Sequence, residues 1–590
     1  MRNSISTVLR QLNCRTTKGI KMRRLILMSA LLTSLFFFPV QATEIHVSSI
    51  AALQAAINSA TAGDVIVLDN GTYLNNTLAI GTSNITVKAA TPGGVYLNGT
   101  NAITILGSHV TFSGFQFTSG SIDGIAIVVI GDYDVLTQLN FKWYSAQKYI
   151  NLQGQYDEVS FCNFENKPTT APQGNLIHIA PNGVVPNYAT IRYCSFQNMP
   201  GAGGDNGNEC IRIANGAQSA YACRTVVEYC YFENTGLGDS EAISVKSREN
   251  VLRYNTFRNN QNAMMVFRNG DDNIGYGNFF INAGGIRVKE ANNVYCYNNY
   301  FENSGLGGSQ DAVTYVYYTA ITTNVLKNIN FIHNTFVDCG DIDLDKGSTN
   351  NTWANNIFKK STGNIFTASS ASGISWAGNM YAGTLGLSIP SGITNADPKL
   401  VKNSDGYYGL SSSSPAIDAS SATYPPVLDI AGIDDDHSLL LDISGRSRPS
   451  TATLKDVGCS EYSATGAVKN RPLKLPDVGP SYLGGPVTDV VNDPVKYPSG
   501  TAPSGFQLLE AYPNPFNPST AISYQLSAFS FVELNIYDAL GREVAKLIDE
   551  EKPAGWHKVV WSARDLPSCV YVCRLVAGQY ADSKKLLLMK

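Results

Sequence analysis

The chain has 590 residues, more than one ordinary globular domain holds, and this length suits an elongated repeat domain with a smaller second unit. Charged residues make up only 15% of the chain and the formal net charge is -4, which excludes the strongly basic surface of a nucleic-acid-binding protein. An anionic partner must therefore be recognised by a local group of cations.

The N-terminal segment has the pattern of an export signal. The basic stretch 21–24 (KMRR) precedes an apolar run over 25–40, and the small residue Ala42 closes it. We therefore expect residues 1–42 to comprise an N-terminal extension and a signal peptide, with Met22 as an alternative start. A membrane anchor is the competing interpretation, but the run is shorter than the ~20 residues of a spanning helix. No later segment fills that role, so no membrane span is expected in the mature chain.

A short phrase then recurs along the chain: an apolar strand, a small or amide residue, any residue, and an aromatic ring. Most repeats are about 22 residues long, without the 3.6-residue periodicity of a helical solenoid. This pattern predicts a right-handed parallel β-helix over residues 43–462, with the segment 50–60 (IAALQAAINSA) as a helical cap on the first coil. The aromatic anchors are Phe117, Phe141, Phe164, Phe196, Phe232, Phe257, Phe280, Phe301, Phe336, Phe358 and Tyr381.

Two residues before each anchor, cysteines give way to asparagines. The cysteines are Cys162, Cys194 and Cys230, and the asparagines are Asn255, Asn278, Asn299, Asn334, Asn356 and Asn379. Asparagines at one corner of successive coils can hydrogen-bond to one another along the axis. We therefore expect an asparagine ladder, and we interpret the cysteines as small buried residues of the same column rather than as disulfides or metal ligands.

Polar residues interrupt the apolar strands most densely between residues 208 and 287. The segments there are NGNECIRIA, GDSEAISVKSRENV, MMVFRNG and GGIRV. They resemble polysaccharide lyase family 6, which includes chondroitinase B and alginate lyases. The resemblance covers most of the predicted β-helix and is strongest over about 80 residues. It implies a β-eliminating enzyme that acts on a uronic-acid-containing polymer with the help of Ca²⁺.

The resemblance also implies residue roles. Lys246 matches the Brønsted base of the family and Arg268 its Brønsted acid. Asp239 and Glu241 match the acidic pair that binds calcium. For the third calcium ligand, an asparagine in the family, Asn208 is the first candidate and Glu209 the second.

Elementary chemistry supports these roles independently. β-Elimination removes the proton at C5 of a uronate and protonates the departing O4, and a cation on the adjacent carboxylate makes the C5 proton more acidic. Carboxylate oxygens are the ligands that Ca²⁺ prefers. Lys246 and Arg268 are 22 residues apart, which is one coil, so their side chains are expected on neighbouring coils.

Two features depart from the family pattern, and one further residue has an open role. Strict alternation places Lys246 and Glu241 on opposite faces of a strand, so a bend or bulge is expected between them. The family has His after the arginine, where this chain has Asn269, which we predict to contact substrate. Arg287 is predicted to bind a substrate carboxylate, with an ion pair to Glu290 as the alternative.

Other interpretations remain open. A β-helix glycoside hydrolase would need paired carboxylates, for which Asp343 and Asp345 are candidates. A noncatalytic glycan-binding protein is the third possibility. His178 and His333 lie within apolar strands and are interpreted as structural, and the cluster around His437 as a surface loop. Among substrates alginate is expected first, and dermatan or chondroitin sulfate second.

The C-terminal part of the chain has a different character. Residues 463–505 are rich in Pro, Gly and Val and predict a linker, whereas residues 506–590 alternate apolar and polar residues as in a small antiparallel β-sandwich. The segments YPNPFNP, IYDALGREV and LLLMK resemble the C-terminal sorting domain of type IX secretion substrates, although Cys569 stands where that family usually has Gly. This resemblance implies the type IX machinery as a partner and a secreted or surface-displayed protein, which we expect to be a monomer.

Overall fold

A computed structural model describes most of the chain from residue 43 onward. The described residues are 43–183, 185–200, 207–235, 241–306, 311–316, 326–344, 348–367, 372–431, 433, 439–463, 468–486, 506–508, 511, 514, 516, 519–526, 530–552, 555–563, 566–578 and 580–589. The proposed signal peptide, Asp239, Asp345 and His437 lie outside these residues.

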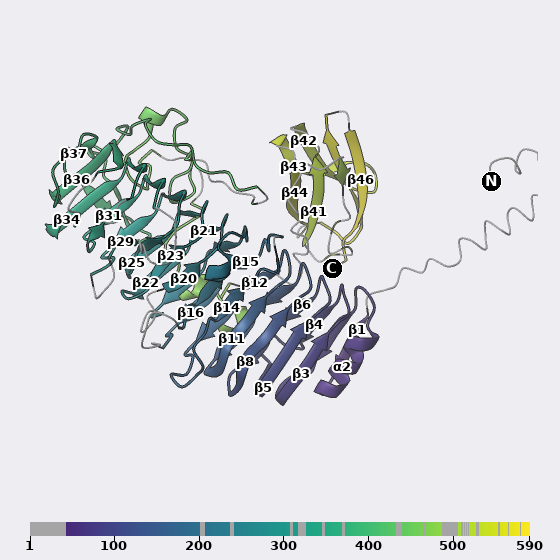
Figure 1. The fold of residues 1–590 in the computed structure, drawn as a ribbon. Helices are drawn as coiled ribbons and strands as arrows, with labels where there is room; N and C mark the ends of the chain where they lie inside the picture. Colours follow the sequence, from purple (N-terminus) through teal and green to yellow (C-terminus); the bar gives the residue numbers. More distant parts are fainter. Residues whose placement is uncertain are drawn as a thin grey trace, which may run out of the picture.

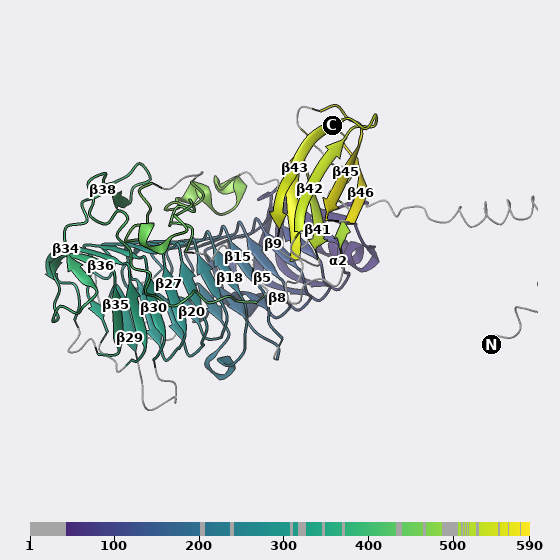
Figure 2. The ribbon, with the colours of Figure 1, turned by 90° about the horizontal axis from the view of Figure 1, so that it is seen from above.

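Parallel strands stack coil upon coil into an elongated solenoid, seen along its side in Figures 1 and 2. Over the described residues it makes about 13 turns. One face is a 14-stranded parallel sheet, with every strand paired to the equivalent strand of the next coil. Its strands are β1 (Glu44–Val47), β2 (Val65–Leu68), β4 (Thr86–Ala89), β6 (Thr111–Ser113), β9 (Val135–Thr137), β12 (Glu158–Ser160), β15 (Thr190–Arg192), β18 (Val226–Glu228), β21 (Val251–Arg253), β24 (Ile274–Tyr276), β27 (Val294–Tyr297), β30 (Ile329–Ile332), β33 (Asn351–Ala354) and β35 (Ile374–Ala377).

The other two faces are joined through two long strands of the first coils, β3 (Gly71–Ile80) and β5 (Val95–Ile105), which run through both of them. On the next two coils the third face is formed by β8 (Gly120–Val129) and β11 (Tyr144–Leu152). The second face continues with β7 (Phe115–Phe117), β10 (Asn140–Lys142), β13 (Asn163–Glu165), β16 (Ser195–Gln197), β19 (Tyr231–Glu233), β22 (Thr256–Asn260), β25 (Phe279–Ala283), β28 (Tyr300–Glu302), β31 (Thr335–Val337), β34 (Ile357–Asn364), β36 (Asn379–Thr384) and β37 (Ile393–Asn395). The third face continues with β14 (Ile177–Ile179), β17 (Ile211–Ile213), β20 (Glu241–Val245), β23 (Met264–Arg268), β26 (Ile286–Lys289), β29 (Val313–Val316) and β32 (Ile342–Asp343). All of the motifs that resemble the lyase family fall on or beside this third face.

The expected cap closes the N-terminal end of the solenoid. Helix α2 (Ile50–Ser59) begins after Ser49, whose side chain accepts a hydrogen bond from the backbone of Ala52 at 3.2 Å. Leu53 and Ile57 are fully buried and join the solenoid core. The helix therefore covers the apolar end of the first coil, as terminal caps of solenoids do.

The repeat predicted from the sequence forms two continuous columns. The phenylalanine anchors stack nearly parallel on successive coils, as in the Phe232–Phe257 pair with centroids 4.7 Å apart. Beside them the asparagine ladder is confirmed, since Asn299 Nδ2 donates to Asn334 Oδ1 at 3.1 Å and accepts through Oδ1 from Asn278 Nδ2 at 3.0 Å. Each amide also donates to a backbone carbonyl, which for Asn299 is that of Gly275. Buried backbone groups at this corner are thus satisfied on every coil.

The cysteine column is confirmed as well. Cys162, Cys194 and Cys230 are fully buried, and among the described residues they are free thiols. The Sγ atom of Cys194 contacts the backbone oxygens of Val159 and Arg192 at 3.5 and 3.4 Å. These cysteines act as small apolar residues at the position that asparagines occupy further along.

After its last coils the chain turns back along the outside of the solenoid. This segment, residues 398–486, contains β38 (Leu400–Lys402), β39 (Tyr408–Leu410), η3 (Ala452–Leu454), η4 (Leu475–Asp477) and η5 (Ser481–Leu483), and we call it the return strap. Cys459 bonds to Thr335, Leu473 to Thr256 and Ser481 to Gln138, at successively earlier coils. The part from 468 to 486, which the sequence suggested to be linker, therefore lies against the coils.

The C-terminal region forms two small antiparallel sheets. One contains β40 (Gln507–Leu508), β41 (Ser519–Leu526) and β44 (Gly555–Ser562), and the other β42 (Ser530–Tyr537), β43 (Glu543–Lys552), β45 (Val570–Ala577) and β46 (Tyr580–Leu587). Side chains of both sheets, including Tyr524 and Leu575, share one hydrophobic cluster. Within the described part of the chain, no helix has the length and apolar character needed to cross a membrane.

Candidate active site

The predicted catalytic residues lie on the third face of the solenoid, where Lys246 directly follows β20 and Arg268 ends β23. On β20, Ala242, Ile243 and Val245 belong to the hydrophobic core, so Glu241, Ser244 and the following Lys246 are directed away from it. Two consecutive inward residues break strict alternation, and the pairing of β20 with β23 shifts register between Glu241 and Ile243. This irregularity is the expected bulge, and it brings Glu241 and Lys246 to the same face.

Lys246 occupies a buried and charge-rich position. Its side chain is only 6% exposed, and its Nζ atom lies 3.8 Å from Glu209 Oε1. Burial lowers the pKa of Lys246, and the charges of Arg212 and Arg268 lower it further, while Glu241 and Glu209 oppose the shift. The balance favours a neutral amine at lower pH than for an exposed lysine.

Arg268 ends β23, one coil further along the axis. Its Nη1 atom donates to Glu241 Oε1 at 2.9 Å, and the Glu241 side chain is 2% exposed. Val245 pairs with Phe267 in the sheet, so Lys246 and Arg268 follow directly on neighbouring strands. The structure thus brings together Lys246, Arg268 and Glu241 as the sequence predicted.

On the preceding coil, Glu209 rather than Asn208 joins this group. Asn208 is buried and its Nδ2 atom donates to the carbonyl of Pro200 at 3.2 Å. Glu209 lies in register with Glu241, because Ile211 pairs with Ile243, and burial together with the Glu241 charge raises the Glu209 pKa. Asp239, the other predicted calcium ligand, lies outside the described residues.

The two predicted substrate-binding residues lie on the C-terminal side of this group. Asn269 follows Arg268 in the left-handed backbone region (φ 63°) and its Nδ2 atom donates to Glu290 Oε2 at 2.8 Å. Arg287 on β26 is half-buried and pairs in register with Val266. Both lie on the third face within a coil of Arg268.

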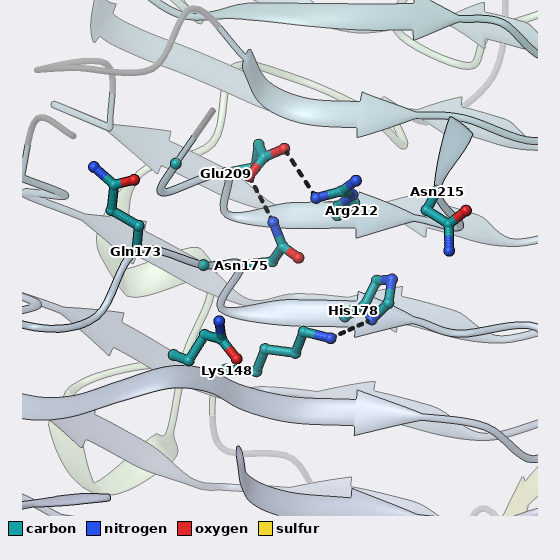
Figure 3. A pocket seen from close by; sticks show the side chains of 10 residues that line it. Lys148, Gln173, Asn175, His178, Glu209, Arg212 and Asn215 are labelled. Carbon is teal, nitrogen blue, oxygen red and sulfur yellow. Dashed lines mark hydrogen bonds and ion pairs between the residues drawn. The ribbon is translucent and has the colours of Figure 1, made fainter. Parts of the chain in front are cut away.

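A pocket of about 410 Å³ opens on the N-terminal side of the group, and sequence reasoning missed it (Figure 3). Lys148, His178 and Arg212, from three successive coils, line it, and Glu209 forms the border with Lys246. His178, interpreted as structural, instead faces this pocket. The signal was available, because His178 in IHI and Arg212 in IRI occupy the same position of consecutive strands.

His333 behaves as the sequence indicated. It is fully buried, its Nε2 atom lies 3.2 Å from Asn355 Nδ2, and burial holds its pKa well below the ordinary value. A neutral, hydrogen-bonded histidine in the core has a structural role.

Comparison with known families decides the classification. The family profile described as chondroitinase B matches residues 47–361, more than half of the chain. The chain belongs to this family. A second profile, described as a secretion system C-terminal sorting domain, matches residues 510–589. Both resemblances inferred from the sequence motifs are thereby confirmed.

Solved structures show the same fold for this chondroitinase B family member. The structure described as the polysaccharide lyase family 6 alginate lyase AlyGC is 24% identical with a TM-score of 0.57, over 66% of this chain and 60% of that one. The chain therefore spans 60% of the length of that enzyme. A family 6 alginate lyase in complex with a trisaccharide is 18% identical, with a TM-score of 0.51, over 64% of this chain and 93% of that one. A mannuronic-acid-specific family 6 lyase from human gut microbiota is 23% identical, with a TM-score of 0.50, over 57% and 86%.

No curated protein matches the chain. The classification therefore depends on the family profile, and the solved structures support the fold.

Proposed function

We propose that this protein is a secreted polysaccharide lyase that cleaves a 4-linked uronic-acid-containing polymer by β-elimination. One observation carries the proposal: Lys246, a buried lysine with a lowered pKa, lies in one charged cluster with Arg268 and the carboxylates of Glu209 and Glu241. Family membership supports the reaction class, and the cluster provides groups suited to each step.

In this mechanism Lys246 is the base. The neutral amine of Lys246 takes the C5 proton of the uronate, and the electron pair of the broken C–H bond forms the C4–C5 double bond. Burial prepares the amine, because the charged form of a desolvated lysine is disfavoured. Glu209 keeps the amine in place through its carboxylate.

Arg268 acts at the leaving group. The bond between C4 and O4 breaks as the double bond forms, and the guanidinium of Arg268 hydrogen-bonds to the departing oxygen and supplies its proton. Glu241 orients this guanidinium through the 2.9 Å hydrogen bond. Asn269 and Arg287, on the C-terminal side, position the substrate.

For the cofactor we propose a calcium ion that Glu209 and Glu241 would hold. These carboxylates stand in register on adjacent coils, and burial together with the like charge of Glu241 raises the Glu209 pKa, a penalty that a bound cation would relieve. Among the described residues no group of three or more His, Cys, Asp or Glu is arranged to hold a metal, so the proposed set also needs Asp239. Asn208, the first candidate for the third ligand from the sequence, is the alternative to Glu209. When bound, the ion would neutralise the substrate carboxylate and make the C5 proton more acidic.

For the substrate we propose alginate first, and dermatan or chondroitin sulfate second. Alginate is named for two of the solved lyases compared above, one of them in complex with a trisaccharide, and another is described as mannuronic-acid-specific. The family profile carries the name chondroitinase B, which supports the second choice.

The decisive experiment is a product assay on polymannuronate, polyguluronate and dermatan sulfate. A lyase yields unsaturated products that absorb in the ultraviolet, and we expect them from at least one of these polymers. A chelator should abolish the signal and added Ca²⁺ should restore it. Cleavage without ultraviolet absorption would instead favour a glycoside hydrolase, for which Asp343 lies on β32 while Asp345 is outside the described residues. Binding without cleavage would favour a noncatalytic glycan-binding protein.

The C-terminal domain supports a secreted or cell-surface location. We propose that the type IX secretion machinery recognises it after export through the N-terminal signal peptide, and that the enzyme acts as a monomer. Deletion of residues 506–590 should leave the lyase inside the cell envelope, which fractionation of producing cells would detect.

A further inference from the structure

The pocket on the N-terminal side of Lys246 continues the proposed active site along the solenoid axis. Arg212 Nη1 lies 4.0 Å from Glu209 Oε1, and the same oxygen is 3.8 Å from Lys246 Nζ, so the two sites share this carboxylate. Figure 3 shows Lys148, His178 and Arg212 entering the pocket from successive coils, which are ~4.8 Å apart. A row of cationic and donor groups with this direction suits a polyanion that lies along the axis.

The side chains of His178 and Lys148 contact each other in this pocket. Lys148 Nζ lies 3.0 Å from His178 Nδ1, and Asn151 Oδ1 lies 2.9 Å from the same nitrogen. His178 is 8% exposed, and among the described residues its buried Nε2 atom has no partner in hydrogen-bonding geometry. A polar atom of this kind in a cavity points to a ligand that completes its hydrogen bonding.

The charges around this pocket favour an anion. Burial, together with the charges of Lys148 and Arg212, lowers the pKa of His178 to about 3, so the imidazole is neutral and does not add to the local charge. Burial and Arg212 also lower the pKa of Lys148, and a bound carboxylate would counter that shift. On the other side of Lys246, Asp341 and Asp343 lie close enough to raise the pKa of Asp311, after the larger effect of burial.

We propose that Lys148, His178 and Arg212 form a specificity-determining subsite, an inference that rests on the proposed function. This subsite binds the carboxylate of a further uronate of the substrate, away from the bond that is cut. The substrate then lies along the solenoid axis and extends from Lys246 toward the N-terminal coils. Lys148 is two coils before Glu209, so only a chain with several residues on this side reaches it.

The test measures binding separately from cleavage. In a Lys246→Arg background, which removes the proposed base, calorimetry compares saturated mannuronate hexamer with trimer. Lys148→Met, which keeps an apolar stem of similar length, should weaken hexamer binding about tenfold, as for the loss of one charge-assisted hydrogen bond, and should leave trimer binding unchanged. Lys148→Arg should restore hexamer binding to within about threefold.

Lys142→Gln is the matched control, because Lys142 pairs with Glu165 at 3.0 Å on the second face of the solenoid and does not line the pocket. It should leave the binding of both oligomers unchanged. The subsite is disproved if Lys148→Met leaves hexamer binding within twofold, or weakens hexamer and trimer equally. A parent enzyme that gives no unsaturated product would disprove the proposed function alone, because hexamer binding and its dependence on Lys148 would still be measured.

Discussion

The asparagine corner and the outward-facing column of the third face lie on the same coils, but one repeats a single residue type and the other varies. At the corner, Asn255, Asn278, Asn299, Asn334, Asn356 and Asn379 repeat one residue and one pattern of hydrogen bonds. In the column, adjacent coils carry different side chains: Asn151, His178, Arg212, Ser244, Val266 and Arg287. The comparison teaches that uniform columns hold a solenoid together, whereas chemistry resides in the columns where the repeat is broken.

The largest effect is expected at the candidate active site, from the loss of the base. Lys246→Gln should lower kcat by up to about 10⁴-fold, the upper end for a general base, while the thermal unfolding midpoint stays close to that of the parent. Steady-state ultraviolet assays and thermal unfolding measure the two quantities.

Lys246→Arg sharpens this prediction. It keeps the positive charge beside Glu209 but cannot give up its proton near neutral pH, so it should be as inactive as Lys246→Gln. Substantial activity in Lys246→Arg would show that the lysine contributes charge rather than a base.

A smaller effect is expected at the asparagine corner, where a substitution should change stability rather than kcat. Asn299→Ala removes the Oδ1 atom that accepts from the Nδ2 and backbone N–H groups of Asn278. It also removes the Nδ2 donor to the Gly275 carbonyl and to Asn334 Oδ1, which keeps the backbone N–H of residue 299, so the free energy of unfolding should fall by about 3 kcal/mol. Denaturant unfolding measures this loss, and kcat of the folded fraction should be unchanged.

Asn282→Gly, on β25 of the preceding coil, serves as the control. It removes exposed side-chain hydrogen bonds with Asn259 and Gln261 and preserves the left-handed backbone at φ 51°. A loss of stability equal to that of Asn299→Ala would mean that burial of the ladder is not what matters.

The smallest effect is a shift in pH dependence. Lys246 acts when neutral, so kcat/KM should be low at acidic pH and rise as the pH increases through its pKa. Because burial lowers that pKa, the rise should occur below the pH at which an exposed lysine titrates, near 10.4. A rate–pH profile with a rise only at or above that value would contradict the proposed environment of Lys246.

The same contrast explains what the sequence could predict. The repeat predicted the coils, the phenylalanine stack and the asparagine ladder, because each coil has the same local pattern. The family-like motifs, with their spacing of one coil, predicted Lys246, Arg268 and Glu241 as one group. The choice between Asn208 and Glu209 depended on a register that no local pattern specifies, and the role of His178 depended on which residues from other coils surround it.

The return strap gives the solenoid a property that stacking alone does not. In a solenoid whose coils contact only their neighbours, coils can separate one at a time from either end. Here Ser481 bonds to Gln138, 343 positions earlier, and Arg448 is buried against Glu461 and Asn298. Fraying of a terminal coil must therefore release bonds elsewhere along the chain, so we expect the domain to unfold as a single cooperative unit and to resist extracellular proteases that exploit partial opening.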